Sequence, residues 1–313
     1  MNTKKLSTRF FIFSFFAAFL LFGCTSQRIL DADAEAYLYP QETYVPESFD
    51  WQQVQPGIDR FDYENPNFPI IYHAIRIDLT TPGLELVCVP TASAADTSSV
   101  GAGKSGEAGT SDATSAAVQV DRSRRQATSS FAAEQNCVVA INATQFDLSS
   151  IIGIHKANGI VLSEPLEKYA AIAFQRELNG EQDYSAKIFT EQTAPELAEY
   201  DYAFGGFFVV LENGEVCYDF VRRHTSRTGA GLSADGRTLY ILVAEGEVPS
   251  KSEGLSYPQC GEIFKAMGCA DALEFDGGGS TELCINGKSV LSYKIHRTQA
   301  TSFGFTLPSP AQE

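Results

Sequence analysis

The sequence predicts an α+β fold with a mixed, largely β core, few helices and a single catalytic-type domain. Short apolar runs separated by turn residues recur through most of the chain. Asn-Gly pairs, which favour two-residue hairpin turns, stand at 158–159, 179–180, 213–214 and 286–287. The clearest helical periodicity lies in residues 256–268. With 313 residues, 44% of them apolar, the chain can build one large domain or two small ones.

The N-terminus resembles the signal peptide of a bacterial lipoprotein. Basic residues precede an apolar run over 10–22, which is too short for a comfortable membrane span. The run ends at Gly23 and Cys24, so we expect removal of residues 1–23 and lipid on Cys24. The alternative is an ordinary secretory signal with an incidental cysteine. Lipid chains would anchor the protein in the bacterial cell envelope, at the outer membrane or a periplasmic face, through a tether and irregular lead-in over residues 24–67.

The catalytic-type domain is expected over residues 68–308. Two strands are predicted within 70–89, and a short helix followed by a buried strand within 129–141. Between them, residues 91–118 are dominated by Ser, Ala, Gly and Thr, which predicts a flexible low-complexity insertion. Further short strands follow, and a closing strand is expected at 302–307.

A strand–helix–strand unit near the C-terminus organises the predicted site. The helix over 256–268 begins with a capping serine and ends at a glycine. Apolar strands are predicted on either side of it, at 238–243 and 272–275. A right-handed crossover between these strands would bring Glu245 and Asp276 to the same edge of the sheet, where such units bind ligands.

A loop of small residues follows Asp276: Gly277, Gly278, Gly279, Ser280 and Thr281. Without Cβ atoms, the three glycines let the backbone adopt positive φ and let a ligand approach closely. Backbone N–H groups and hydroxyls turned into one concavity would form an anion nest beside the Asp276 carboxylate. The alternative is a tight turn into a hairpin. Upstream, Arg227 is a candidate phosphate ligand, because a guanidinium fork matches phosphate oxygens.

Charge and cysteine usage narrow the function classes. A net charge of -16 and a pI near 4.7 argue against nucleic-acid binding, because an acidic surface repels phosphate backbones. Six cysteines remain besides Cys24; an oxidising compartment permits disulfides, but four lie in apolar runs, which favours buried thiols. The lack of a CxxC pair and the scarcity of histidine argue against a structural zinc site. Arg122, Arg124 and Arg125 form a basic run, interpreted as a solvated segment rather than a binding patch.

The order of these pieces resembles the phosphodiester glycosidase family over residues 70–288. The earlier pieces are Asp78-Leu79-Thr80, Thr128-Ser129-Ser130-Phe131, Ala140-Ile141-Asn142, Gly205-Gly206, Arg227-Thr228-Gly229-Ala230-Gly231, Ala234-Asp235-Gly236-Arg237-Thr238 and Glu245-Gly246. The decisive piece is Asp276-Gly277-Gly278-Gly279-Ser280-Thr281 with Asn286-Gly287-Lys288 behind it. Their number and order, rather than any single piece, carry the resemblance.

The resemblance implies hydrolysis of a sugar-1-phosphodiester at the anomeric C–O bond, within glycan or envelope polysaccharide metabolism. It implies Asp276 and Glu245 as the catalytic carboxylates. The implied substrate-binding set is Arg227, Thr228, Gly277, Gly278, Gly279, Ser280, Thr281 and Asn142. No ligand spacing in the sequence requires a metal or another cofactor, although a divalent cation bridging Asp276, Glu245 and the phosphate would fit the chemistry.

The segment after the first buried strand departs from the family pattern. Family members usually have Asn-Gly-Gly-Phe-Phe there, whereas this chain has Asn142-Ala143-Thr144-Gln145-Phe146. We expect the loss of two glycines to alter the turn, and Thr144 and Gln145 to add bulk and polarity near the pocket. Glu245 also stands where Asp is common. These departures support a rival hypothesis, a non-catalytic lipoprotein that binds carbohydrate or sugar phosphate. A third interpretation is a polysaccharide-assembly factor that acts through protein partners.

Overall fold

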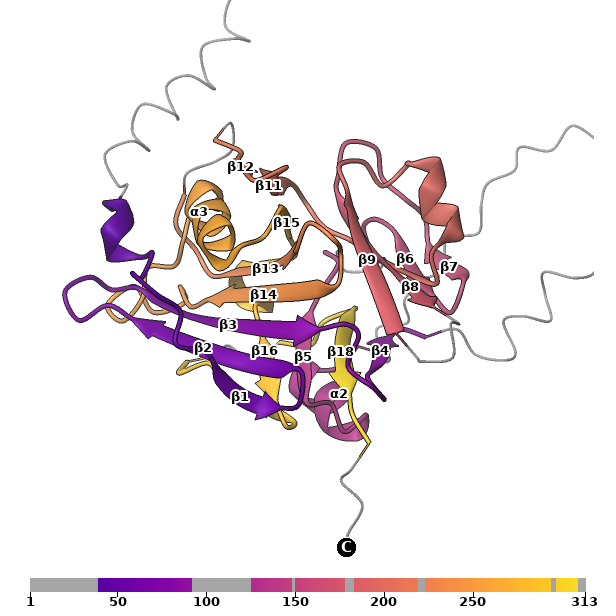
Figure 1. The fold of residues 1–313 in the computed structure, drawn as a ribbon, viewed down its shortest axis with the longest axis horizontal. Helices are drawn as coiled ribbons and strands as arrows, with labels where there is room; N and C mark the ends of the chain where they lie inside the picture. Colours follow the sequence, from indigo (N-terminus) through magenta and orange to yellow (C-terminus); the bar gives the residue numbers. More distant parts are fainter. Residues whose placement is uncertain are drawn as a thin grey trace, which may run out of the picture. The chain divides into compact units, whose positions relative to one another are not determined.

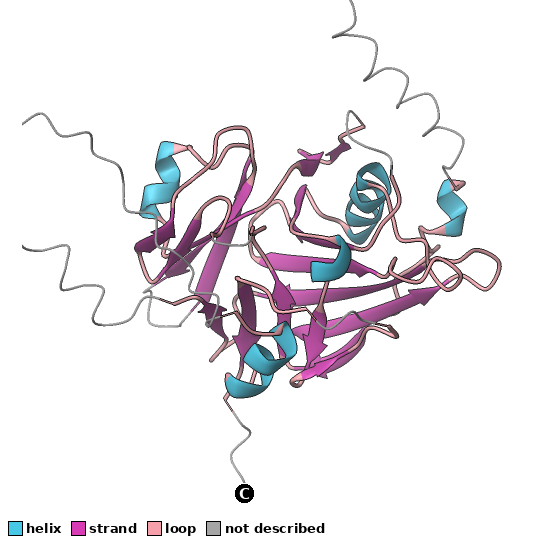
Figure 2. Ribbon diagram, turned by 180° about the vertical axis from the view of Figure 1, so that it is seen from behind, coloured by secondary structure: helices cyan, strands magenta, loops and turns pink. Residues whose placement is uncertain are grey.

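The part of the chain that the structure describes is built around three β-sheets (Figures 1 and 2). The computed structural model describes residues 39–91, 125–147, 150–177, 183–218, 223–293 and 297–308. The domain described below begins at Pro40. The predicted signal peptide, Cys24 and nearly all of the predicted insertion lie outside the described residues. In the described part, no helix is long and apolar enough to cross a membrane.

The largest sheet has eight strands in the spatial order β1-β2-β3-β14-β13-β15-β11-β12. Their bounds are β1 Gln52–Gln55, β2 Ile58–Glu64, β3 Ile71–Asp78, β14 Thr238–Ala244, β13 Arg227–Leu232, β15 Asp271–Glu274, β11 Val209–Glu212 and β12 Glu215–Val216. Every neighbouring pair among these strands runs antiparallel. The sheet therefore has no parallel ladder, although it contains the predicted crossover.

Two five-stranded sheets complete the fold. One has the order β7 (Ile160–Ser163), β6 (His155–Ala157), β10 (Tyr202–Gly205), β8 (Ala171–Glu177) and β9 (Asp183–Phe189). The other has the order β17 (Lys288–Ser289), β16 (Leu283–Ile285), β5 (Val139–Asn142), β18 (Ser302–Thr306) and β4 (Glu85–Val89). Aromatic side chains join the sheets: the Phe303 ring stacks on Phe204 at 4.6 Å between centres, and Phe275 lies 5.8 Å from Phe303. The core thus lies between the sheets, and Phe275 fixes the chain just before Asp276.

Two α-helices, α2 (Thr128–Glu134) and α3 (Tyr257–Met267), and the 3₁₀ turns η2 (Gln41–Thr43), η5 (Pro195–Glu199) and η6 (Gly278–Ser280) are described. Helix α3 confirms the sequence prediction. Its N-cap Ser256 and Gln259 form a capping box, and Gly268 ends it in the left-handed region at φ 95°. Its apolar stripe, with Cys260, Ile263 and Phe264, is buried.

The predicted irregular lead-in is wrong for residues 52–64, because β1 and β2 form one edge of the largest sheet. Strand β2 pairs with β3 along its whole length, from Ile58 opposite Ile77 to Glu64 opposite Ile71. Only Ile58 and Phe61 of β2 are buried and its other side chains are at least partly exposed, so its polar composition masked a regular strand. The expectation that Trp51 and Phe61 pack on the domain is confirmed, since the two rings lie 6.0 Å apart.

The crossover is confirmed, with one addition. The chain leaves β14, passes through α3 and returns along β15, but β13 lies between the two strands and pairs antiparallel with both (Figure 1). Arg227 is opposite Ala244, and Gly229 is opposite Glu274. The start of β13 therefore meets the ends of β14 and β15, and Glu245, Asp276 and Arg227 stand at one edge of the sheet.

Candidate active site

The Asp276 loop is fixed where the largest sheet meets the sheet that contains β5. The Asp276 N–H donates to the Ala143 carbonyl at 3.2 Å, and Asn142 Nδ2 donates to the Asp276 carbonyl at 2.6 Å. Asn142 Oδ1 in turn accepts from Thr228 Oγ1 and the Glu282 N–H, both at 2.9 Å. Asn142 and Thr228 are buried. The structure thus uses both side chains to position the loop.

Glycine is required in this loop for two separate reasons. A Cβ on Gly277 would lie 2.8 Å from the Ser226 carbonyl, and Gly278 has a φ of 58°. The loop forms the 3₁₀ turn η6, so several of its N–H groups are already used. Gly278, Ser280 and Thr281 donate to the carbonyls of Ser226, Gly277 and Gly278. The predicted anion nest therefore has fewer donors to offer than the sequence suggests.

Arg227 is held rigidly beside the loop. Its Nε donates to the Leu255 carbonyl at 2.9 Å, and its Nη2 donates to the Arg223 carbonyl at 2.7 Å. The guanidinium also stacks on Tyr257, 3.9 Å from the ring centre. The side chain is 7% exposed and forms no ion pair with any carboxylate in the described ranges. A buried cation without a carboxylate partner favours an anionic ligand.

A cavity of about 460 Å³ joins Arg227 to Asp276. Its lining consists of Tyr169, Phe207, Phe208, Arg223, Thr225, Arg227, Tyr257, Asp276, Gly277 and Gly278. This volume lies in the range of small-molecule sites. Four of the predicted site residues therefore meet in one cavity: Arg227, Asp276, Gly277 and Gly278.

Sequence reasoning missed the aromatic wall of this cavity. Phe207 and Phe208 follow β10, and both ring centres lie about 6 Å from that of Tyr169. The Phe207 N–H donates to the Glu274 carbonyl at 2.7 Å, and the Glu274 N–H donates to the Phe208 carbonyl at 3.0 Å, so both residues are fixed at the end of β15. A Cβ on Gly206 would lie 2.7 Å from the Glu274 carbonyl. The signal was the Gly205-Gly206-Phe207-Phe208 run, where a close backbone approach places two rings side by side.

Asp276 has a shifted acidity. Burial raises its pKa, while the nearby Ser280 hydroxyl, the charge of Arg297 and the Gly277 N–H act in the opposite direction. A carboxylate with a raised pKa is a stronger base than an ordinary aspartate. Asp276 therefore combines access to the cavity with increased basicity.

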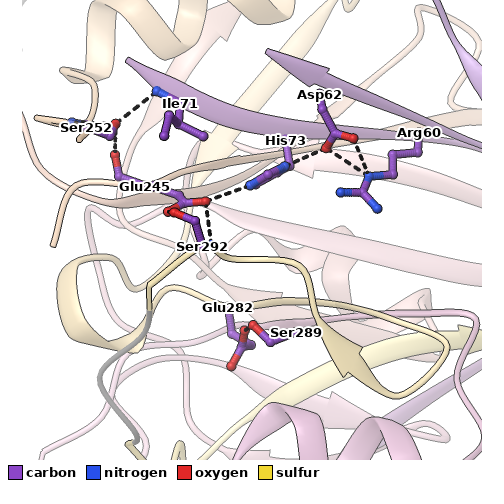
Figure 3. Close-up of polar contacts among 10 residues, drawn as sticks. Arg60, Asp62, Ile71, His73, Glu245, Ser252, Glu282, Ser289 and Ser292 are labelled. Atoms are coloured by element: carbon purple, nitrogen blue, oxygen red, sulfur yellow. Dashed lines mark hydrogen bonds and ion pairs between the residues drawn. The ribbon is translucent and has the colours of Figure 1, made fainter. Parts of the chain in front are cut away.

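The second predicted carboxylate, Glu245, lies in a saturated network instead (Figure 3). Its Oε1 is 3.0 Å from His73 Nε2 and accepts from the Ser292 N–H at 2.9 Å, while Oε2 accepts from Ser292 Oγ. His73 Nδ1 lies 2.6 Å from Asp62 Oδ1. Burial alone would lower the pKa of His73, but Asp62 and Glu245 together raise it.

Glu245 itself is held in its ionised form. Burial would raise its pKa, but hydrogen bonds from His73 and Ser292 give a net lowering. Glu245 lines a separate, water-sized void together with Gly278, Gly279 and Thr281. It therefore lies behind the glycine loop, and it is not among the residues that line the cavity with Asp276.

Comparison with known proteins shows the family to which the chain belongs. The phosphodiester glycosidase family model matches residues 135–306, more than half of the chain. The chain belongs to the phosphodiester glycosidase family. No curated protein sequence matches it significantly.

Solved structures share the fold at low sequence identity. The catalytic domain of zebrafish N-acetylglucosamine-1-phosphodiester alpha-N-acetylglucosaminidase has a TM-score of 0.55 at 14% identity, over 84% of this chain and 85% of that chain. A hypothetical protein from Synechocystis has a TM-score of 0.58 at 12% identity, over 83% of this chain but only 64% of its own, less than two thirds. A protein from Burkholderia pseudomallei has a TM-score of 0.52 at 12% identity, over 76% and 74% of the two chains. At these identities the likeness shows the fold alone.

This phosphodiester glycosidase family member has another carboxyl group near the cavity, Glu274, which the sequence reading treated as part of a strand. It is fully buried at the end of β15, and neither oxygen has a hydrogen-bond partner of ordinary geometry among the described residues. Burial raises its pKa to about 8, against the opposing effects of Arg227 and Cys260. Burial therefore favours the neutral form of Glu274, which forms no ion pair with Arg227. A glutamate within an otherwise apolar strand was the available signal.

The sequence also led to expectations about metal sites and about the state of the cysteines. No group of three His, Cys, Asp or Glu side chains within the described ranges is arranged to hold a metal ion. The six cysteines in the same ranges form no disulfide with one another, as the apolar surroundings predicted. Five of them are buried, which agrees with a packing role.

Proposed function

We propose that this protein hydrolyses a sugar-1-phosphodiester at the anomeric C–O bond. The observation that carries the proposal is the shared cavity of Arg227 and Asp276, which is lined by both a buried cation without a carboxylate partner and a basic carboxylate. A phosphodiester placed there would have its charge beside the guanidinium and its sugar carbon within reach of the aspartate.

The reaction follows from these two groups. Asp276 accepts a proton from a water molecule, whose oxygen forms a bond to the anomeric carbon. The bond from that carbon to the phosphate oxygen breaks, and its electron pair leaves with the phosphomonoester. Arg227 stabilises the charge that grows on the phosphate oxygens. A phosphomonoester is a good leaving group, so the reaction requires no strong general acid.

The surroundings of the site fit a sugar substrate. Tyr169, Phe207, Phe208 and Tyr257 offer apolar ring faces to the cavity, which suit the C–H faces of a sugar ring. Asn142 and Thr228 hold the Asp276 loop in place without lining the cavity.

The proposal is tested by measuring sugar release from a panel of sugar-1-phosphodiesters, including UDP-N-acetylglucosamine. Asp276→Asn and Arg227→Ala should each abolish release, whereas Arg76→Ala is the matched control because Arg76 pairs with Asp59 away from the cavity. Sugar release by the natural protein that survives both substitutions would contradict this site. Thermal unfolding of each variant separates loss of activity from loss of fold.

One observation favours the second candidate, a non-catalytic protein that binds carbohydrate or sugar phosphate. Only one of the two predicted carboxylates lines the cavity, since Glu245 belongs to the His73 network. Calorimetric binding of a sugar phosphate that Arg227→Ala abolishes, without any sugar release, would establish this alternative. The assembly-factor interpretation has no comparable support, because the large hydrophobic side chains exposed in the described residues are only Val161, Tyr218 and Tyr293.

The cellular location of the protein is also part of the proposal. We infer from the sequence that Cys24 carries lipid and holds the protein in the bacterial cell envelope, where envelope glycans would be its substrates. Metabolic labelling with a fatty acid tests this directly. Label incorporated by the natural protein and lost in Cys24→Ser supports the anchor, and label retained in Cys24→Ser contradicts it.

A further inference from the structure

The arginines in the described residues fall into two groups. Arg60, Arg76, Arg176 and Arg237 each pair with a carboxylate. The others, Arg125, Arg223, Arg227 and Arg297, form no ion pair with a carboxylate that the structure describes. In a chain with a net charge of -16, this separation concentrates uncompensated positive charge on a few residues.

The four unpaired arginines form two pairs near Asp276. Arg223 and Arg227 line the cavity together with Asp276. Arg125 and Arg297 lie over the ring of Phe146, with guanidinium carbons 4.7 Å and 5.2 Å from its centre. The charge of Arg297 acts on Asp276, and its Nη1 lies 3.7 Å from where a Cβ of Gly279 would stand. We call Arg125 and Arg297 the second cationic pair.

The second cationic pair comes from different elements than the first. Arg297 precedes β18 and Arg125 precedes α2, and the two segments are joined by the isolated bridge between Gln126 and Gln299. Since both guanidinium carbons lie near one ring, they are at most about 10 Å apart. Both guanidinium groups are therefore close enough to attract the same anionic group.

Buried polar groups without partners lie in the chain segments next to Phe146 and Arg297. Gln145 is 5% exposed, and neither its amide nitrogen nor its amide oxygen has a hydrogen-bond partner in the described structure. The Gln299 side chain donates to the Ser280 carbonyl at 3.0 Å, but its oxygen has no such partner, and neither has Thr144 Oγ1. Buried donors and acceptors are normally satisfied, so these atoms await hydroxyl groups of a ligand or water.

Two of these buried polar side chains, Thr144 and Gln145, belong to the segment that departs from the family pattern. Thr144 and Gln145 stand where family members usually have Gly and Phe. Both side chains are buried, and neither lines the cavity that holds Arg227 and Asp276. Arg125, which the sequence suggested was merely solvated, is half-buried and stacks on Phe146.

We propose that Arg125 and Arg297, with Gln145 and Gln299, form a second subsite that binds an additional anionic group of the substrate. The inference rests on the proposed function and names the substrate class: a 1-phosphodiester of an acidic sugar. The phosphodiester takes Arg223 and Arg227, while a carboxylate or second phosphate on the sugar takes Arg125 and Arg297. The amides of Gln145 and Gln299 bind neighbouring sugar hydroxyls.

The test is a matched pair of substrates acting on the full chain in detergent micelles. The methyl diesters of glucose 1-phosphate and glucuronic acid 1-phosphate differ only in a CH₂OH against a carboxylate, and a 6-phosphorylated glucose diester distinguishes a second phosphate. The natural protein should favour an acidic substrate by about tenfold or more in kcat/KM, and added salt should reduce the preference.

Variants locate the preference. Arg297→Ala should lower kcat/KM on the acidic diester more than on the glucose diester, and so remove the preference for the acidic sugar. Arg227→Ala should lower both rates alike, and Arg76→Ala should lower neither. Arg297 is exposed, so its substitution should leave thermal unfolding unchanged. Equal rates on both substrates by the natural protein, or equal losses on both in Arg297→Ala, would overturn the second subsite.

Binding measurements keep the inference separate from the proposed function. If no diester is hydrolysed, calorimetric titration with the same matched pair still reports the subsite. A preference for the acidic diester that Arg297→Ala removes would support the subsite even though the proposed catalysis had failed. Absence of any preference in binding would overturn the subsite, and hydrolysis of both diesters at equal rates would overturn it while leaving the proposed catalysis intact.

Discussion

The ends of β14 and β15 lie at the same edge of one sheet, but the carboxyl groups at these two ends differ in their hydrogen-bond partners and in the direction of their pKa shifts. At the end of β14, Glu245 has hydrogen-bond partners on both oxygens and a lowered pKa. At the end of β15, Glu274 and Asp276 both have raised pKa values, and Asp276 faces the cavity. A fully partnered charge maintains structure, whereas incompletely compensated groups beside a cavity indicate chemistry.

The largest expected effect belongs to Asp276. Asp276→Asn should reduce sugar release by about 10³-fold, because the amide cannot accept the proton of the attacking water. Stability should change little, since the loop is held mainly through its backbone and Asn142. Single-turnover assays with thermal unfolding measure both effects. Near-normal turnover by this variant would show that Asp276 is not the base of the reaction, and so would remove the proposed functional difference between Asp276 and Glu245.

Glu274 should make stability fall with rising pH. Its pKa of about 8 in the folded state lies above the ordinary 4.5, so its contribution is full below about pH 4.5 and is lost as pH rises towards 8. The slope in that window should approach 1.4 kcal/mol per pH unit. Glu274→Gln should remove this slope in urea unfolding between pH 5 and 8. Parallel pH profiles for the variant and the natural protein would show that Glu274 ionises normally.

Glu245 should matter for stability more than for chemistry. Glu245→Gln leaves His73 between one carboxylate and one neutral amide, and removing one member of a buried ion pair destabilises by about 3 kcal/mol. Urea unfolding at pH 6 measures the change, and the kcat of the folded variant should stay within about tenfold of the natural value. A stable but inactive Glu245→Gln variant would instead place Glu245 in the reaction.

The smallest expected effect concerns the pKa of His73, which can be measured directly. Because Asp62 and Glu245 raise its pKa above 6.5, the stability it contributes is full below 6.5 and is lost as pH rises through the folded-state pKa. The imidazole resonances of His73 should therefore titrate above pH 6.5, and at a lower pH in Glu245→Gln. A His73 titration at or below 6.5 in the natural protein would show that the network does not carry the expected charges.

Local sequence signals predicted most of the fold that surrounds the site. The serine cap, apolar stripe and terminal glycine of α3 are short-range features, and all three are present in the structure. The Asn158-Gly159, Asn213-Gly214 and Asn286-Gly287 pairs form the turns of the β6–β7, β11–β12 and β16–β17 hairpins. The polar strand β2 escaped prediction because its stability comes from pairing with β3, a contact that its own composition does not show.

By itself, the sequence determined which residues gather at the edge of the sheet. The crossover through α3 requires Glu245 and Asp276 to meet there, and the Gly277-Gly278-Gly279 run requires a close backbone approach. Only the tertiary structure decided what each group does. The charge of a carboxyl depends on neighbours far away in sequence: His73 and Ser292 ionise Glu245, while burial protonates Glu274. The pairing of some arginines and not others is likewise a property of packing, because Coulomb energies depend on distance in space rather than along the chain.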